Sequence, residues 1–267
     1  MECLPKTPAG NYKVNFLTSP ARHRAVAGSR SLDSRCAVML LSVAAHGEAP
    51  AESVHLPVEV LKISPTAPES ESIEYAAGYI KRGEVVAVPT DTFYGLAVDP
   101  TNLASIEAVF RAKGRPETKA LPILVNSVEQ AITLIRDVPD VFLKLAHEFW
   151  PGALTLVVTA TSRLPLKVTG NTGRVALRWA NAPIITSLIA ATGGPITGTS
   201  ANLSGFPSCS NANQIVQQLG DRIPLILDAG DTGGSLASTI VRIDGDQYSI
   251  VREGKIPDAD IHKALES

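Results

Sequence analysis

The stretch VVAVPTDTFYGL, residues 85–96, joins a continuous apolar run to a polar segment. Val85–Val88 shows no alternation of polar and apolar residues, which predicts a strand buried on both faces. Pro89 ends the run, and residues 90–92 (TDT) begin a loop at its carboxyl end. Ligands of open α/β sheets bind outside the carboxyl ends of the strands, so this loop is a candidate site. A Ser/Thr or Asx turn that caps the strand is the structural alternative.

Helices and strands alternate on both sides of this stretch. Apolar residues at helical spacing predict helices at 73–82, 103–112, 128–135, 140–149, 183–191 and 211–219. Apolar or alternating runs predict strands at 121–125, 154–158, 174–179 and 225–227, and a closing hairpin at 238–243 and 247–251. Pro122 favours an edge or bulged position for its strand. The alternation predicts one α/β domain with a mixed sheet.

Composition excludes several classes of protein. Of 267 residues, 45% are hydrophobic and 19% are charged, as in ordinary globular proteins. The net charge of -2 means that any contact with nucleic acid needs a local basic patch. The three cysteines form no CxxC pair and the five histidines are scattered, so we expect no protein-built metal site. Apolar runs are too short to span a membrane, and a reducing, cytoplasmic location is expected.

The first 68 residues differ from the rest of the chain. They are rich in Pro, Ser, Ala and Arg and show little periodicity. We interpret residues 1–68 as a leader that is disordered or precedes the native start, with organellar targeting as the alternative. Residues 69–256 form the expected domain, and residues 257–267 a C-terminal tail.

Two cations bracket a glycine directly after the predicted helix at 103–112. Lys113 offers a mobile point charge and Arg115 a planar fork, and Gly114 lets a ligand approach the backbone closely. Together they suit phosphate or carboxylate oxygens. A cationic helix end that interacts with the helix dipole explains the same residues without a ligand. Lys119 adds a third cation before the next strand.

The segment SANLSG, residues 200–205, is a polar loop after a strand-like run. Period-two spacing places Ser200 and Asn202 on one side, where hydroxyl and amide groups can bind phosphate, ribose or carboxylate. Neither a Walker loop, a GxGxxG turn nor a GxSxG elbow is present. Arg174 and Arg178 share one face of a predicted strand, and Arg252 follows another. So many cations at sheet elements predict a polyanionic ligand.

These segments, in this order, resemble the YrdC family of threonylcarbamoyl-AMP synthases. The matching stretches are PTDTFYGL at 89–96, AKGRP at 112–116, FWPGALTL at 149–156, VALR at 175–178, TSANLSG at 199–205, STIV at 238–241 and VREG at 251–254. The resemblance implies a twisted sheet with a basic concave pocket. It also implies an enzyme, a nucleotidyltransferase that condenses L-threonine, bicarbonate and ATP to threonylcarbamoyl-adenylate and pyrophosphate. That product feeds N6-threonylcarbamoyladenosine (t6A) synthesis in tRNA.

The resemblance also assigns roles to residues. The catalytic signature residues are Lys113, Arg115, Ser200 and Asn202. Threonine contacts are Thr92, Arg178 and Ser200. The ATP contacts are Lys113, Arg115, Lys119, Arg174, Asn202, Ser210 and Arg252. Mg²⁺ is expected to be held mainly by the ATP phosphates, with no protein-built metal site.

The chain departs from the family pattern at three points. Ile123-Leu124-Val125 lacks a histidine that longer members carry there, Glu253 replaces a proline, and the chain ends without the C-terminal domain of the long form. We therefore expect the short, single-domain form. Expected partners are the tRNA threonylcarbamoyl-transfer machinery and, weakly, tRNA itself. A non-catalytic module that binds double-stranded RNA or tRNA is the alternative function, and a hydrogenase-maturation type protein is a third.

Overall fold

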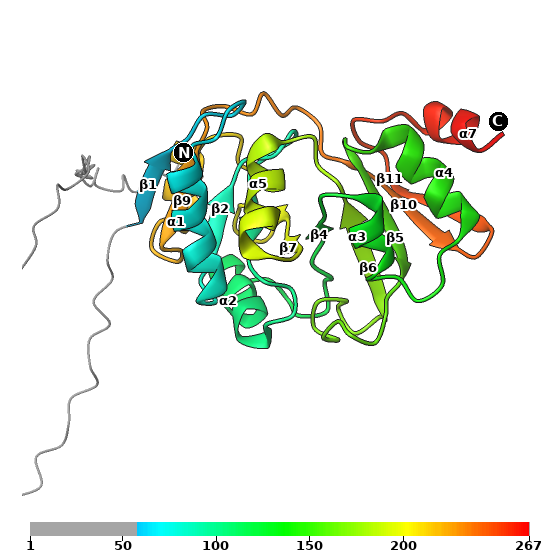
Figure 1. The fold of residues 1–267 in the computed structure, drawn as a ribbon, viewed down its shortest axis with the longest axis horizontal. Coiled ribbons are helices and arrows are strands. Elements are labelled where there is room, and N and C mark those ends of the chain that lie inside the picture. Colours follow the sequence, from blue (N-terminus) through cyan, green and yellow to red (C-terminus); the bar gives the residue numbers. More distant parts are fainter. Residues whose placement is uncertain (1–57, 267) are drawn as a thin grey trace, which may run out of the picture. The chain divides into compact units, whose positions relative to one another are not determined.

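The computed structural model describes residues 58–266, which form a mixed α/β fold with two sheets (Figure 1). The first sheet has the order β1-β9-β2-β3-β8, and the second has the order β11-β10-β5-β6-β4-β7. The first contains β1 (Glu59–Lys62), β2 (Val86–Val88), β3 (Gly95–Ala97), β8 (Thr199–Ser200) and β9 (Leu225–Asp228). The second contains β4 (Ile123–Leu124), β5 (Leu154–Thr159), β6 (Arg174–Arg178), β7 (Ile196–Thr197), β10 (Thr239–Asp244) and β11 (Gln247–Arg252).

The predicted α/β class is confirmed, but the strands divide between two mixed sheets instead of one. In the first sheet β1, β9 and β2 run parallel, and β3 and β8 are antiparallel additions. Strands β7 and β8 belong to different sheets and are separated only by Gly198. Thr197 of β7 also links the second sheet to the β3 segment of the first, because its backbone N–H donates to Val98 O and its hydroxyl donates to Leu96 O. The chain therefore passes from one sheet to the other at this point.

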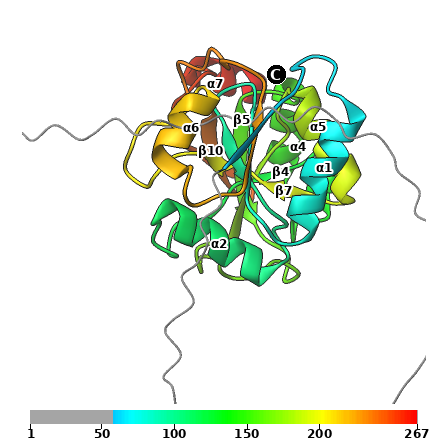
Figure 2. The same ribbon diagram turned by 90° about the vertical axis from the view of Figure 1, so that its left-hand side faces the viewer.

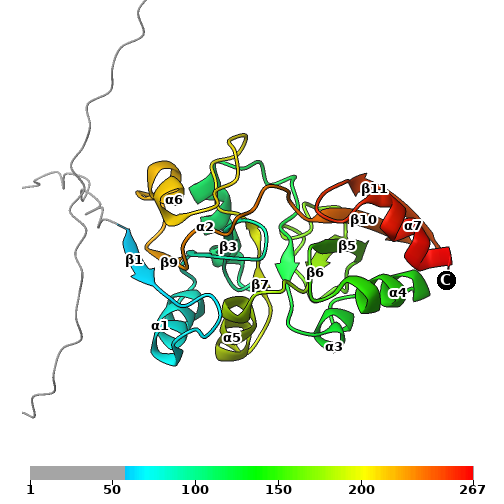
Figure 3. The same cartoon turned by 90° about the horizontal axis from the view of Figure 1, so that it is seen from above.

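Helices cover both faces of the first sheet. Figure 2 shows α1 (Ser70–Lys81) and α5 (Pro183–Thr192) on one side, and α2 (Leu103–Lys113) and α6 (Ala212–Leu219) on the other; Figure 3 agrees. Ile73, Val86 and Ile185 belong to the core on the α1 and α5 side. Burial on both faces explains why β2 reads as an unbroken apolar run.

The second sheet has one apolar face and one face that is left free of helices. Helices α3 (Val128–Ile132), α4 (Asp140–Phe149) and α7 (Asp258–Glu266) accompany this sheet. Leu154, Leu156 and Leu177 are fully buried in the core with α4, as the period of two requires. The residues between them, on the opposite face, remain available to build a site.

Four sequence expectations are corrected by the fold. Glu59–Lys62 pairs in parallel with β9, so the ordered chain begins before residue 69, because these residues complete the edge of a sheet. The predicted loop at 90–96 contains the start of β3. Strand β4 pairs with both β6 and β7, so it does not lie at the edge of the sheet. Pro122 is compatible with this position because it lies directly before the strand. The expected tail forms α7, anchored by the buried Ile261.

The other predicted helices and strands are confirmed with small shifts of their ends. The leader interpretation for residues 1–57 falls outside the described residues. Among residues 58–266, no helix is both long and apolar enough to cross a membrane.

Candidate functional site

A cavity of about 370 Å³ lies on the helix-free face of the second sheet. Thr155 and Val157 of β5, Ala176 and Arg178 of β6, and Ile240 of β10 form its wall, and they alternate with the buried core residues. The loop after β2 and the β8 segment of the first sheet close the other side. The described residues that line the cavity include three arginines and no acidic side chain. The cavity therefore suits an anionic ligand.

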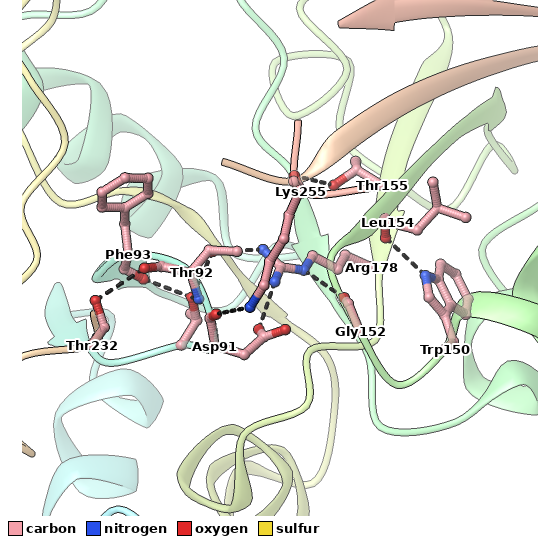
Figure 4. Close-up of polar contacts among 12 residues, drawn as sticks. Asp91, Thr92, Phe93, Trp150, Gly152, Leu154, Thr155, Arg178, Thr232 and Lys255 are labelled. Atoms are coloured by element: carbon pink, nitrogen blue, oxygen red, sulfur yellow. Dashed lines mark hydrogen bonds and ion pairs between the residues drawn. The ribbon is translucent and has the colours of Figure 1, made fainter. Parts of the chain in front are cut away.

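Arg178 is the most enclosed of these arginines, at 6% exposure (Figure 4). Its Nε donates to Gly152 O at 3.0 Å and its Nη1 to the Thr92 hydroxyl at 2.9 Å. Its Nη2 forms an ion pair of 2.5 Å with Asp91 Oδ1. Gly152 belongs to the segment before β5, and Asp91 and Thr92 belong to the loop after β2. A single guanidinium thus ties the two sheets together at the cavity and keeps one N–H on each Nη for a ligand.

The loop after β2 is built from its own hydroxyl groups. Thr90 Oγ1 donates to Phe93 O at 2.6 Å and accepts from Thr92 N at 3.1 Å. This is the Ser/Thr turn that the sequence offered as the structural alternative. Thr90 and Thr92 also line the cavity. The structural and the ligand-binding interpretations of this loop are therefore both compatible with the geometry.

Arg115 enters the cavity from the end of α2. Gly114 has a φ of 56°, in the left-handed region that favours glycine, and ends the helix there. Arg115 Nη2 donates to Ala120 O at 2.8 Å, and burial lowers the pKa of the guanidinium. Its Nη1 has no partner within the described part of the chain. The side chain is therefore fixed in position while half of its fork remains free for an anion.

Lys113 lies behind the cavity wall and not in it. It is only 2% exposed, and its ammonium donates to Asn202 O at 2.7 Å, to Asn202 Oδ1 at 3.2 Å and to Ser200 O. Burial, and then the like charge of Arg115, lowers the pKa of Lys113 to about 7. The three oxygen acceptors oppose this shift, because only the ammonium supplies three N–H donors. Lys113 thus organises the loop that presents Ser200.

Asn202 is an internal brace of the same loop. It is 6% exposed, its Nδ2 donates to Leu203 O and Phe206 O, and its Oδ1 accepts from the Ser200 hydroxyl. Ser200 itself lines the cavity. The predicted four-residue signature is brought together, with Arg115 and Ser200 facing the cavity and Lys113 and Asn202 supporting them.

Arg252 reaches the cavity from the end of β11. Its Nη2 donates to Ser238 O at 2.7 Å and to Ser238 Oγ at 3.3 Å. Burial, and then the charge of Arg178, lowers the pKa of Arg252. Ser238 in turn shares a hydrogen bond of 2.8 Å with Thr155 across two neighbouring strands. This chain of contacts fixes the third cation.

The segment between β9 and β10, residues 229–238, runs from one sheet to the other (Figure 1), and its last two residues, Ala237 and Ser238, line the cavity. Tyr94 is fully buried and its hydroxyl donates to Gly230 O at 2.8 Å. Burial raises the pKa of Tyr94 to about 12. Thr232 Oγ1 donates to Thr92 O at 2.9 Å. The segment is therefore fastened directly to the loop that holds Arg178.

Five predicted ATP contacts do not line the cavity, and two of them, Lys113 and Asn202, support Ser200 from behind its wall. Arg174 lies on the same face as Arg178 but near the opposite end of β6, where it pairs with Asp244. The Ser210 hydroxyl donates to Asp231 Oδ2 at 3.2 Å, outside the cavity. Lys119 is exposed, and only its backbone carbonyl meets Arg115. Spacing along the chain did not reveal that these side chains are directed elsewhere.

Sequence reasoning missed three hydroxyl groups of the site: Thr155, Ser208 and Ser238. Thr155 and Ser238 are buried polar residues within otherwise apolar strand segments, which is a signal that the sequence does contain. Ser208 follows an irregular loop and carries no such signal. Among residues 58–266, no group of three or more His, Cys, Asp or Glu is placed to hold a metal ion.

The fold and the cavity define a two-sheet α/β protein with a cationic, hydroxyl-lined site for an anionic small molecule. The family described as Telomere recombination, Sua5/YciO/YrdC, matches residues 78–254. The chain belongs to this family. A Mycobacterium tuberculosis relative is 36% identical over 196 residues, covering 73% of this chain and 90% of the relative.

Two further comparisons involve Pyrococcus abyssi. A relative named threonylcarbamoyl-AMP synthase is 35% identical over 197 residues, which is 74% of this chain and 58% of the relative. The crystal structure of P. abyssi Sua5 complexed with L-threonine is 34% identical with a TM-score of 0.74, covering 77% of this chain and 60% of that one. This chain thus spans less than two thirds of these longer proteins.

Proposed function

We propose that this protein is a threonylcarbamoyl-AMP synthase, which makes threonylcarbamoyl-adenylate and pyrophosphate from L-threonine, bicarbonate and ATP. The observation that carries the proposal is the convergence of Arg115, Arg178 and Arg252 on one cavity that no acidic side chain lines. Both substrates with fixed negative charge, the amino-acid carboxylate and the triphosphate, need such cations. The names of the relatives, and the threonine in one of them, support the same activity.

In this proposal the two ends of the cavity bind different substrates. Thr92 and Arg178 take the threonine, since a hydroxyl and a guanidinium lie 2.9 Å apart there. Ser200, which Lys113 and Asn202 hold in place, also contacts the threonine, and Arg115 and Arg252 take ATP. Arg174, Lys119 and Ser210 are left out of the ATP site because their side chains do not line the cavity.

The proposed reaction requires no side-chain nucleophile. The threonine amine attacks bicarbonate and water leaves, which gives a carbamate. A carbamate oxygen then attacks the α-phosphorus of ATP, the bond to the β-phosphate oxygen breaks, and pyrophosphate leaves. The protein contributes proximity and fixed positive charge around the phosphates, which stabilise the transition state.

In this proposal Mg²⁺ is bound by the phosphates of ATP and not by protein side chains. Asp91, in the loop beside the cavity, is paired with Arg178, and the described residues form no cluster of three or more carboxylate, histidine or cysteine side chains. Mg²⁺ therefore enters with the ATP phosphates, as is common for nucleotide enzymes. A cytoplasmic location and supply of the t6A machinery in tRNA modification complete the proposal.

Pyrophosphate release from ATP by the full chain tests the function. We expect release that depends on both L-threonine and bicarbonate, with threonylcarbamoyl-adenylate detected by mass spectrometry. Omission of either substrate is the control. A protein that binds tRNA tightly but releases no pyrophosphate under these conditions is an RNA-binding module, and the proposed activity would then be wrong.

A further inference from the structure

We propose that Lys255, which lies outside all of the matched stretches, is an additional binding residue for the carboxylate of the amino-acid substrate. This inference rests on the proposed function. Lys255 follows β11, three residues after Arg252, in a turn that faces the loop after β2. Figure 4 shows its side chain extending toward Asp91, whose carboxylate pairs with Arg178.

Several hydrogen bonds hold the backbone around Lys255, although the turn is exposed. Lys255 N donates to Ala237 O at 2.9 Å. The Thr239 hydroxyl accepts from Gly254 N and from Ile256 N, each at 3.0 Å, and donates to Ile256 O at 2.6 Å. A side chain that starts from such a turn has its direction set before any ligand binds, which lowers the entropic cost of a contact.

The ammonium group at the end of this side chain is only weakly engaged. Its one contact with the described residues is Asp91 O, at 3.5 Å, where a full hydrogen bond is about 2.9 Å. No carboxylate within the described residues forms an ion pair with it. Lys255 does not line the cavity in this structure, but it places a mobile cation with spare donors at the loop whose Asp91 pairs with the guanidinium that we assign to the carboxylate.

Charge and position together favour a carboxylate at this point. Asp91 already neutralises one side of Arg178, so Arg178 alone offers a bound anion a partly compensated charge. A second cation restores the net positive charge at the threonine end of the cavity. A phosphate would be drawn instead to Arg115 and Arg252, which have no acidic partner among the described residues.

The test compares Lys255→Met, which keeps the length but removes the charge, with Lys255→Arg and with Lys263→Met. Lys263 is exposed on α7 and serves as the matched control. Threonine binding by calorimetry and the KM values for threonine and ATP are measured on the full chain. For an exposed charged pair we expect Lys255→Met to weaken threonine binding about 2- to 5-fold, with the KM for ATP unchanged. Lys255→Arg should retain most of the affinity.

L-Threoninamide, which lacks the charged carboxylate, identifies the group that Lys255 recognises. The wild-type protein and Lys255→Met should bind the amide equally weakly. Equal affinity of the two proteins for threonine would overturn the inference while leaving the proposed function intact. A loss confined to the KM for ATP would also overturn it. If the wild-type protein binds no threonine, the proposed function and this inference both fail.

Discussion

The ammonium of Lys113 donates to two oxygens of Asn202, the backbone carbonyl at 2.7 Å and the side-chain Oδ1 at 3.2 Å. The two residues are 89 positions apart in the chain. The contact joins the end of α2 to the loop after β8 and makes one structural unit of two distant motifs. Lys113 acts on the site through this loop, whereas Arg115 and Ser200 face the cavity.

The first prediction concerns the pH dependence of stability. The pKa of Lys113 is about 7 in the folded protein, whereas in the unfolded chain it has its ordinary value of about 10.5. Above pH 7 the unfolded chain therefore holds a proton that the folded chain has lost, so stability rises with pH across this window. We expect the wild-type protein to gain about 2 kcal/mol over Lys113→Met between pH 7 and pH 9, in urea unfolding at both values.

The same unfolding measurement also tests the opposite case, in which Lys113 stays protonated. If the difference between wild type and Lys113→Met does not change with pH, the three oxygen acceptors hold the pKa near its ordinary value. Lys113 would then be an ammonium throughout the range.

The second prediction assigns Arg115 to ATP. Arg115→Ala should weaken ATP binding by about 1 to 3 kcal/mol, the range of a hydrogen bond to a charged group, without unfolding the protein. Arg111→Ala is the matched control, because Arg111 lies four residues earlier, in the last turn of α2, and is exposed. Calorimetry with ATP measures both variants. Equal ATP affinity in the two variants would place the nucleotide elsewhere.

The third prediction concerns the shape of Arg178. Arg178→Lys keeps the charge, but an ammonium cannot reproduce the planar fork that meets Gly152, Thr92 and Asp91 at once. We expect kcat/KM for threonine to fall about 10- to 100-fold, as loss of charged hydrogen bonds implies. The threonine dependence of pyrophosphate release at saturating ATP measures this. A variant with unchanged kinetics would show that charge alone suffices.

The fourth prediction tests the correction made at Arg174. Its guanidinium pairs with Asp244 and also donates to Ile243 O, away from the cavity. Arg174→Ala should therefore change the KM for ATP by less than about twofold, since the side chain does not line the cavity and its ion pair is partly exposed to solvent. An increase of the size seen for Arg115→Ala would return Arg174 to the nucleotide site.

Arg174 and Arg178 show which features of the site could be predicted from the sequence and which could not. Period-two spacing placed both on one face of one strand, and the structure confirms this. Spacing alone does not reveal which partner each guanidinium meets, because Asp244 and Asp91 lie 70 and 87 positions away along the chain. Local patterns therefore predicted the helices, the strands and the cationic character of the site.

The division of the strands between two sheets could not be predicted from the sequence, for a related physical reason. Strands β7 and β8 are two residues each, too short to show any periodicity. Their pairing depends on β4 and β3, which are distant in the chain. Strand β1 was missed likewise, since four residues next to a sequence without periodicity give little signal and its partner β9 is distant in the chain.

The last prediction concerns Gly234, in the segment between β9 and β10. A Cβ at this position would lie 1.6 Å from Thr92 O and 2.7 Å from Thr92 C, so the neighbouring backbone leaves no room for one. Thr92 cannot give way easily, because Arg178 holds its hydroxyl and Thr232 holds its carbonyl. Gly234→Ala should therefore displace the segment from the loop and destabilise the protein by about 1 to 3 kcal/mol, the usual range for overpacking.

Gly194→Ala is the matched control, because a Cβ there meets nothing within 4 Å. It should leave stability unchanged or raise it slightly through the entropy of the unfolded chain. Urea unfolding measures both variants, and limited proteolysis reports whether residues 229–238 become accessible only in Gly234→Ala. Since the displaced segment no longer supports Thr92, the KM for threonine should rise in Gly234→Ala and stay constant in Gly194→Ala. Equal stability and equal KM in the two variants would mean that the segment does not hold the threonine end of the cavity.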